Sequence, residues 1–124
     1  MERVTSIRGA ITVKENTIKD IKEATVQLIS EIFRQNKLSE QNIINIIFTV
    51  TQDLDSVNPA TILREELKLN STPMLCVQEI KVKGGLPKCI RVLIQTYSTV
   101  KKNEVKHIYV GDAEKLRPDL SYEV

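Results

Sequence analysis

The feature that most constrains the fold is one long amphipathic segment that lies between two runs rich in β-branched residues. Thr17 and Asp20, three residues apart, resemble the capping box that begins a helix. One face of the segment repeats at helical spacing through Ile21, Thr25, Leu28, Ile29, Ile32 and Phe33. We therefore expect a helix that ends near Asn36 and packs against a sheet.

Other runs along the chain predict strands and a second, shorter helix. The strand runs are rich in Val, Ile and Thr and cover residues 3–13, 43–50, 73–82, 89–99 and 105–110. Gly9 in the first run marks either a bulge or a close backbone approach. Asn58 can cap the second helix, which reaches about Leu67 and carries Pro59 in its first turn, where no N–H is needed.

The order of these elements predicts the fold class. Residues 73–82 and 89–99 flank the turn sequence KGGLPK, so we expect them to pair as an antiparallel hairpin. The whole order predicts an α+β domain with a five-stranded mixed sheet and two helices mainly on one face. The length of 124 residues is that of one domain, residues 1–124. Residues 112–124 predict an irregular tail that is mobile unless it docks.

Composition and charge argue against several classes of function. The 18 basic and 16 acidic residues leave a formal charge of +2, spread along the chain, which gives little support for nucleic-acid binding. The longest apolar runs, such as residues 43–50, are far shorter than the roughly 20 residues of a membrane-spanning helix. The first ten residues lack the apolar core of a signal peptide. We expect a cytoplasmic protein with reduced cysteines that binds neither membrane nor nucleic acid.

Familiar catalytic and cofactor motifs do not occur in the sequence. Cys76 and Cys89 are 13 residues apart, which matches no zinc pattern, and His107 is the only histidine, so we expect no metal site. The chain also lacks a GxSxG elbow, a P-loop and a GxGxxG turn. The sequence therefore favours chemistry that needs no metal, no cofactor and no activated nucleophile.

Three of the six arginines occupy positions where apolar neighbours predict burial: Arg8 in SIRGA, Arg64 in TILRE and Arg91 in CIRVL. A guanidinium stays charged, so its burial requires a carboxylate or a bound anion beside it. Glu79 in LCVQEI is the one inward-facing acid that the pattern offers, and one acid cannot neutralise three arginines. If the three converge, they fit a dianionic ligand with planar carboxylates.

The same residues also have purely structural interpretations. Arg91 could pair with Glu79, and Arg64 with one of the two glutamates that follow it, as ion pairs that only support the fold. Cys76 is typical of a small buried apolar residue, and Tyr109 of a core aromatic. Residue types alone leave both interpretations open.

Four segments of the chain together resemble a known family: IRGAITV, TQDLDSVNPATILRE, CVQEIKVKGGLPKCIRVL and HIYVGDAEKLRPDL. Their order and spacing, over nearly the whole chain, are similar to those of monofunctional chorismate mutases of the trimeric, pseudo-α/β-barrel class. The combination of QE, GGL-x-KCIRV and the terminal LRPDL is the specific part of this resemblance.

The resemblance implies an isomerase that converts chorismate to prephenate by a Claisen rearrangement, in phenylalanine and tyrosine biosynthesis. It implies no cofactor, and a homotrimer whose active sites lie at the subunit interfaces. The rearrangement needs no proton transfer and no covalent intermediate. It needs a dianion held in its compact form and positive charge where the ether oxygen gains electron density.

The resemblance also implies a role for each candidate catalytic residue. Arg91 contacts the breaking ether oxygen and the enolpyruvyl carboxylate. Arg8 and Tyr109 hold that carboxylate, and Glu79 accepts a hydrogen bond from the ring hydroxyl. Arg64 lies at the mouth of the site of a neighbouring subunit.

Further substrate-binding positions follow from the same resemblance. One strand supplies pocket-lining residues beside the glutamate: Leu75, Cys76, Val77 and Gln78. In the tail, Leu116 and Arg117 fold over the pocket, which implies a lid.

Two positions depart from the family pattern. Asn58 stands where the pattern has a phenylalanine, and Thr61 where it has a lysine. Both lie at the rim, so we expect weaker substrate binding with the chemistry kept, since an exposed charge contributes about 1 kcal/mol or less.

Other functions stay open beside the enzyme. The same arginines could serve a non-catalytic trimer that binds a dianionic metabolite for regulation, and the residues at 58 and 61 are what favour it. A trimeric hydrolase of imines or enamines would share the fold order but not the GGL-x-KCIRV or LRPDL segments. A nucleic-acid binder that uses the lysines near the hairpin predicts salt-sensitive affinity.

Overall fold

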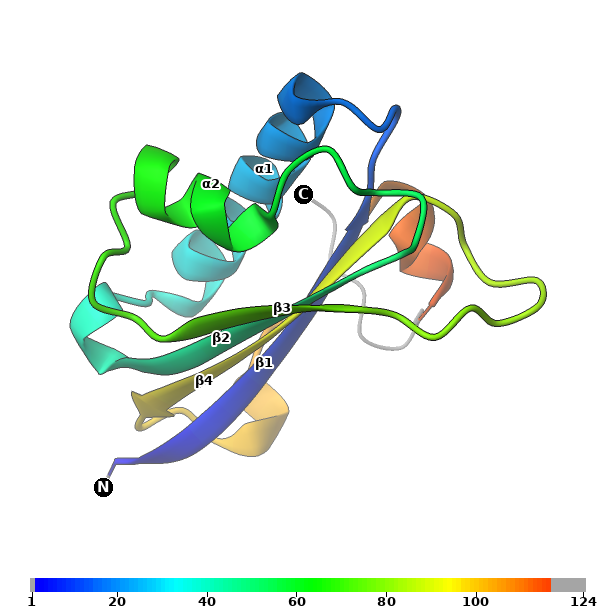
Figure 1. The fold of residues 1–124 in the computed structure, drawn as a ribbon. Coiled ribbons are helices and arrows are strands. Elements are labelled where there is room, and N and C mark those ends of the chain that lie inside the picture. Colours follow the sequence, from blue (N-terminus) through cyan, green and yellow to red (C-terminus); the bar gives the residue numbers. More distant parts are fainter. Residues whose placement is uncertain (1, 117–124) are drawn as a thin grey trace.

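The computed structural model describes residues 2–116, which form a sheet covered by helices (Figure 1). The strands are β1 (Arg3–Thr12), β2 (Ile43–Val50), β3 (Met74–Gln78), β4 (Cys89–Ser98) and β5 (Ile108–Val110). The α-helices are α1 (Ile18–Asn36) and α2 (Pro59–Glu66), and short 3-10 helices are η1 (Glu40–Asn42), η2 (Lys102–Glu104) and η3 (Gly111–Lys115). This arrangement confirms the predicted α+β class with a five-stranded mixed sheet.

Both helices begin at the caps that the sequence predicts. The backbone N–H of Asp20 donates to Thr17 Oγ1 at 3.1 Å, and that of Ala60 donates to Asn58 Oδ1 at 2.8 Å. Each cap satisfies an N–H that has no partner within the first helical turn. Lys37 ends α1 in the left-handed conformation, with φ of 52°. Within residues 2–116, neither helix is long and apolar enough to cross a membrane.

The strand order is β3-β2-β4-β1-β5, so the predicted hairpin of residues 73–82 with residues 89–99 is wrong. β3 pairs with β2 in parallel, and β4 pairs antiparallel with both β2 and β1. The reason is α2, which carries the chain across one face of the sheet between β2 and β3, as parallel neighbours require. The chain must then pass β2 to reach β4. Residues 79–88 therefore leave the sheet, and β3 ends at Gln78 rather than near residue 82.

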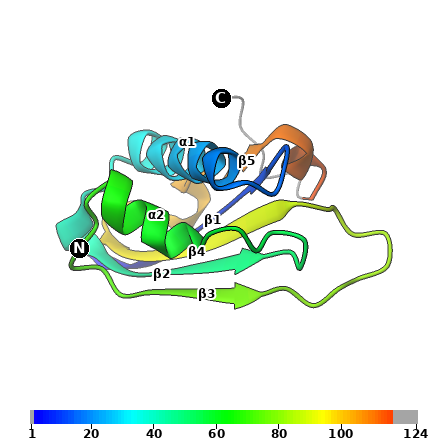
Figure 2. The same ribbon diagram turned by 45° about the horizontal axis from the view of Figure 1, so that its top comes forward.

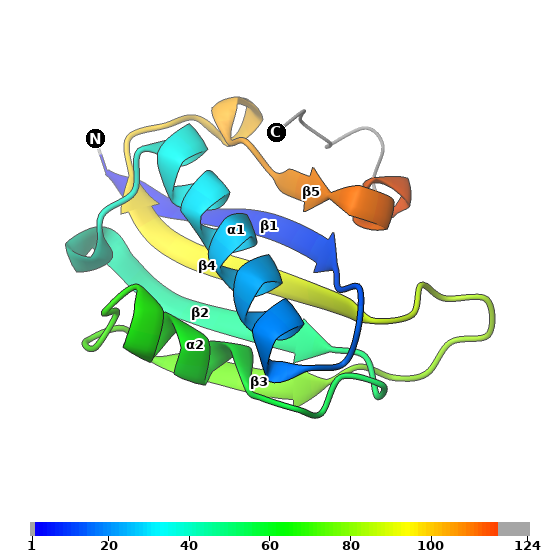
Figure 3. The ribbon, with the colours of Figure 1, turned by 90° about the horizontal axis from the view of Figure 1, so that it is seen from above.

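The hydrophobic core lies between the helices and one face of the sheet (Figures 2 and 3). It is built mainly of Ile, Leu and Val from α1, α2 and the central strands. Gly9 marks a close approach and not a bulge, because β1 pairs with β4 without interruption through Gly9. A Cβ there would lie 2.8 Å from Ile32 Cδ1 and 3.0 Å from the carbonyl oxygen of Ile108. The one irregularity in the described sheet lies between Ile43 and Asn45.

A smaller apolar cluster forms on the opposite face, at one end of the sheet. Its buried members are Ala10, Cys89, Tyr109 and Ala113, with Leu86 and Leu116 packed against them. Ala113 belongs to η3, so the start of the tail forms a short 3-10 helix that packs against the sheet, which is the docked case that the sequence left open. Ala113 is fully buried in this cluster.

Candidate active site

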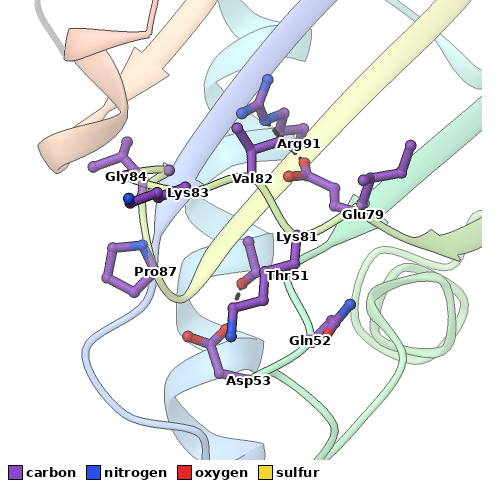
Figure 4. A pocket seen from close by; sticks show the side chains of 13 residues that line it. Thr51, Gln52, Asp53, Glu79, Lys81, Val82, Lys83, Gly84, Pro87 and Arg91 are labelled. Carbon is purple, nitrogen blue, oxygen red and sulfur yellow. Dashed lines mark hydrogen bonds and ion pairs between the residues drawn. The ribbon is translucent and has the colours of Figure 1, made fainter.

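A cleft of about 490 Å³ opens where β2 ends, where the chain leaves β3 and where β4 begins (Figure 4). Its walls are residues 51–53 after β2, residues 79–87 between β3 and β4, and Arg91 of β4. A cleft at strand ends is a common place for a ligand site, because loops there surround side chains that rigid strands hold in place.

Arg91 and Glu79 meet inside this cleft. Arg91 Nε lies 2.9 Å from Glu79 Oε1, and Thr49 Oγ1 donates to the same oxygen at 2.6 Å. Thr49 is the direct neighbour of Arg91 across β2 and β4, so sheet register fixes the three side chains together. Backbone pairing adds to this, because Glu79 N–H donates to the Val50 carbonyl at 2.8 Å.

The geometry leaves Arg91 able to bind an anion. Its Nε atom is buried but makes no well-directed hydrogen bond, although Glu79 lies beside it. The Arg91 side chain is 40% exposed against 18% for Glu79, so the guanidinium is the more open member of the pair. Among residues 2–116, Arg91 has no second carboxylate partner. A planar cation held from one side in this way suits a carboxylate or a developing negative charge on the other side.

Hydrogen bonds between two loops hold the start of β4 next to Arg91. Thr51 Oγ1 accepts from Cys89 N–H at 2.9 Å and donates to Asp53 Oδ1 at 2.5 Å. Both carboxylate oxygens of Asp53 accept from Lys88 N–H, at 3.1 and 3.0 Å. Lys88 has a left-handed backbone with φ of 48°, which these bonds support. We call Thr51 and Asp53, with their bonds to residues 88 and 89, the β4 clamp.

The cysteines are not set up as nucleophiles. Burial raises the pKa of the Cys89 thiol to about 11, and the nearby Arg91 guanidinium opposes this only in part. Burial also raises the pKa of the Cys76 thiol, whose side chain packs against the main core. Both thiols are therefore protonated at neutral pH, and the thiolate is the reactive form. Cys76 packs on the helix side of the sheet, opposite the face that carries Glu79.

Arg8 and Tyr109 share the sheet face of Arg91. Ala10 of β1 lies between Arg91 of β4 and Tyr109 of β5, and Arg8 is two residues before Ala10 on the same face. Neighbouring strands are about 4.8 Å apart, so Arg91 and Tyr109 stand roughly 10 Å apart across this face. Tyr109 is 2% exposed and packs in the smaller cluster, as the structural interpretation expected.

The residues of α2 lie away from the cleft within one chain. Arg64 is exposed, and its Nη2 donates to Thr61 Oγ1 at 3.3 Å. The interpretation of Arg64 as a partner of Glu65 or Glu66 is wrong, because Glu66 pairs with Lys22 at 2.8 Å and no described residue forms an ion pair with Arg64. Asn58 is exposed and caps α2.

The other predicted lining residues of β3 lie on different faces of the sheet, because successive side chains of a strand point to opposite faces. Leu75 and Val77 are 64% and 48% exposed on the helix-free face, and Gln78 is exposed at the strand end. Leu116 packs beside Tyr109 in the smaller cluster. Arg117 lies outside the described residues.

Sequence reasoning missed part of the cleft wall. It did not assign Thr49, the β4 clamp or the loop of residues 80–87 to the site. A signal was present, since TQDLD follows a buried strand directly and KGGLP precedes the CIRV strand, so both segments lie at strand ends. No three His, Cys, Asp or Glu side chains among the described residues come together as metal ligands.

These observations define a class of protein: an α+β chain whose cleft presents a guanidinium fixed by a carboxylate and a threonine. Comparison with known proteins narrows the class. The family model described as chorismate mutase type I matches residues 4–120. The chain belongs to this family.

Individual relatives agree with the family match. The chain is 36% identical to chorismate mutase AroH of Bacillus subtilis, over 95% of this chain and 93% of that protein. It is 40% identical to chorismate mutase AroH of Thermus thermophilus, over 94% and 96%. The structure of a chorismate mutase from Clostridium thermocellum matches with a TM-score of 0.86 and 43% identity, over 89% of this chain and 97% of that one. The resemblance seen in the sequence is thereby confirmed.

Proposed function

We propose that this protein is a chorismate mutase, an isomerase that rearranges chorismate to prephenate in aromatic amino acid biosynthesis. The observation that carries the proposal is the Arg91 guanidinium, held 2.9 Å from Glu79 at a cleft, in a chain that belongs to the chorismate mutase type I family. In the reaction the ether C–O bond breaks while a C–C bond forms within the same molecule. All atoms and electrons stay in the substrate, so no external acid, base or oxidant is required.

Arg91 supplies the main catalytic effect. As the C–O bond lengthens, the ether oxygen gains negative charge, and the guanidinium stabilises it. Because Glu79, Thr49 and the sheet fix the arginine beforehand, little reorganisation is needed when this charge develops. Glu79 has a second role as acceptor for the ring hydroxyl of the substrate, through lone pairs that its contacts with Arg91 and Thr49 leave available.

The substrate carboxylates bind to further cations and donors on the same sheet face. Arg8 and Tyr109 hold the enolpyruvyl carboxylate beside Arg91. Arg8 lies one strand and Tyr109 two strands from Arg91 on the same sheet face, and Arg8 has no ion pair with a described carboxylate, which supports this role. Leu75, Cys76, Val77 and Gln78 line the rest of the pocket, Cys76 through its backbone because its side chain faces the core.

The working form is a homotrimer that forms a pseudo-α/β barrel, with each site shared by two subunits. Two features support this. The helix-free sheet face exposes Leu75, Val77 and Tyr97. Arg64 is exposed outside the cleft of its own chain and forms no ion pair among the described residues. Arg64 of a neighbouring subunit, with Asn58 and Thr61 near it, completes the mouth of the site. A monomer would then lack a cation at each site.

The tail acts as a lid in this proposal. Leu116 packs against Tyr109 and so brings the chain to the edge of the proposed carboxylate site. Arg117 lies outside the described residues, and we propose it as a further contact of the bound dianion. Closure of such a segment excludes water and strengthens each charge contact inside.

We place the reaction in the cytoplasm, which is supported by two free cysteines, Cys76 and Cys89. The non-catalytic regulatory trimer gains no support, because the relatives named above are chorismate mutases.

The direct test follows chorismate by its ultraviolet absorbance, with purified protein, a chelator and no added cofactor. We expect conversion to prephenate by the natural chain and loss of turnover in Arg91→Ala. Saturable binding without turnover by the natural chain would instead establish the regulatory protein. Full activity in Arg91→Ala would show that Arg91 is not a catalytic residue.

A further inference from the structure

Two lysines stand in the wall of the cleft. Lys81 and Lys83 belong to the loop that leaves β3, and both line the same cavity as Arg91 (Figure 4). Both side chains are exposed, and neither forms an ion pair with a carboxylate among residues 2–116. Their charges are therefore available to a ligand that approaches from solution.

The acidic residues of the cleft bind groups other than these two lysines. Glu79 pairs with Arg91 and accepts from Thr49, while Asp53 accepts from Thr51 and from the Lys88 N–H. These two acids are the carboxylates that line the cleft, against three cations at Arg91, Lys81 and Lys83. The three basic and two acidic residues give the cleft lining a net charge of +1, and among residues 2–116 Lys81 and Lys83 are its cations without an ion-pair partner.

We infer that Lys81 and Lys83 form a cationic entrance that attracts a dianionic substrate to the cleft and lowers its KM without entering the chemical step. This inference rests on the proposed function. Unpaired charges of one sign at the mouth of a cleft raise the local concentration of an oppositely charged ligand. Because the lysines lie at the entrance, they attract the bound substrate and its transition state equally, so KM changes and kcat does not.

The size of the effect follows from charge and screening. A dianion interacts twice as strongly as a monoanion with each lysine, and exposed charges interact over about one Debye length, roughly 8 Å at physiological salt. Removing both lysines should raise KM about 3- to 10-fold at low ionic strength. At high salt, where the Debye length is about 3 Å, the difference should fall below about 2-fold.

The experiment compares two double variants with the same change in net charge. Lys81→Gln with Lys83→Gln neutralises the entrance. Lys101→Gln with Lys102→Gln neutralises two exposed lysines beyond the opposite end of β4, outside the cleft. Steady-state kcat and KM for chorismate are measured for both and for the natural chain, at low and at high ionic strength.

We expect a higher KM only for the entrance variant, only at low salt, and with unchanged kcat. Lys81→Arg with Lys83→Arg keeps the charges and should restore the KM of the natural chain. An unchanged KM in the entrance variant, an equal shift in the Lys101 and Lys102 variant, or a matching loss of kcat would overturn the inference. Those outcomes leave turnover by the natural chain intact, whereas failure of the proposed function would abolish it there.

Discussion

At the scale of single residues, the start of β4 carries two ionisable side chains that differ in charge, the Arg91 guanidinium and the neutral Cys89 thiol. Arg91 places its guanidinium 2.9 Å from Glu79 in the wall of the cleft. Cys89, two residues earlier, is 1% exposed, and its burial keeps the thiol neutral. The strand end thus presents one fixed cation and no thiolate that could pair with it.

The neutral thiol makes stability depend on pH. Burial raises the pKa of Cys89 from 9.0 to about 11, so above pH 9 the unfolded chain loses this proton while the folded chain keeps it. Folded stability is therefore fully present below pH 9 and falls as pH rises from 9 toward 11, by at most about 2–3 kcal/mol.

The measurement is the free energy of unfolding in denaturant for the natural chain and for Cys89→Ala, between about pH 8 and pH 10.5. As pH rises, the free energy of unfolding of the natural chain should fall relative to that of Cys89→Ala. Because Cys76 is present in both, its titration cancels. A difference that stays constant over this range contradicts the assignment.

Sequence reasoning was most informative about residues whose type is unusual for their surroundings. Arg91 in CIRVL and Glu79 in LCVQEI indicated a charged site because buried charges need partners, and the structure pairs them. Thr49 and Asp53 gave no such signal, since a strand threonine and a loop aspartate are ordinary. Their importance comes from register and loop closure, which composition does not encode.

At the scale of elements, the β3–β4 connection shows where local patterns mislead. KGGLPK between two strand-like runs is typical of a hairpin, yet β2 lies between β3 and β4. The decisive information was the helix before β3, because a strand that follows a crossover helix pairs in parallel. Once β3 pairs with β2, the glycine-containing turn becomes a long loop, and that loop forms one wall of the cleft.

The β4 clamp should be essential to this arrangement. Thr51→Val keeps the shape of the side chain but removes the acceptor for Cys89 N–H and the donor to Asp53. Leaving a buried donor unpaired costs about 1–3 kcal/mol, which we expect as the loss in the free energy of unfolding.

Chemical denaturation of Thr51→Val beside Thr99→Val measures this loss. Thr99 is exposed, so its replacement should change stability by less than about 0.5 kcal/mol. Equal stability of the two variants would mean that the clamp does not hold β4.

At the scale of the whole molecule, the two faces of the sheet differ. The helices cover one face completely enough to bury Phe48, Ile46 and Ile94, whereas the other face leaves Leu75, Val77 and Tyr97 at least 48% exposed. Exposed apolar side chains gathered on one face are typical of an interface between subunits. The proposed trimer explains this asymmetry and the position of Arg64 together.

A charge on the open face should therefore prevent assembly. Leu75→Asp would place a carboxylate in the proposed interface, so sedimentation should give a mass below three times the 14.1-kDa chain, with turnover lost. Ile18→Asp makes the same change at an exposed position on α1, on the other side of the sheet, and should stay trimeric and active. A Leu75→Asp trimer, or a fully active monomer, would contradict the shared site.

The central claim is that catalysis comes from a fixed, planar cation at residue 91, and the kcat of Arg91→Lys tests it most directly. Lysine keeps the charge, but it lacks the planar guanidinium, which can contact Glu79 with one N–H group and a substrate oxygen with another. The account predicts a fall in kcat of about 10²- to 10³-fold, with Arg91→Ala lower still and both variants folded by circular dichroism. A kcat for Arg91→Lys close to that of the natural chain would show that charge alone is sufficient, and the account would be wrong.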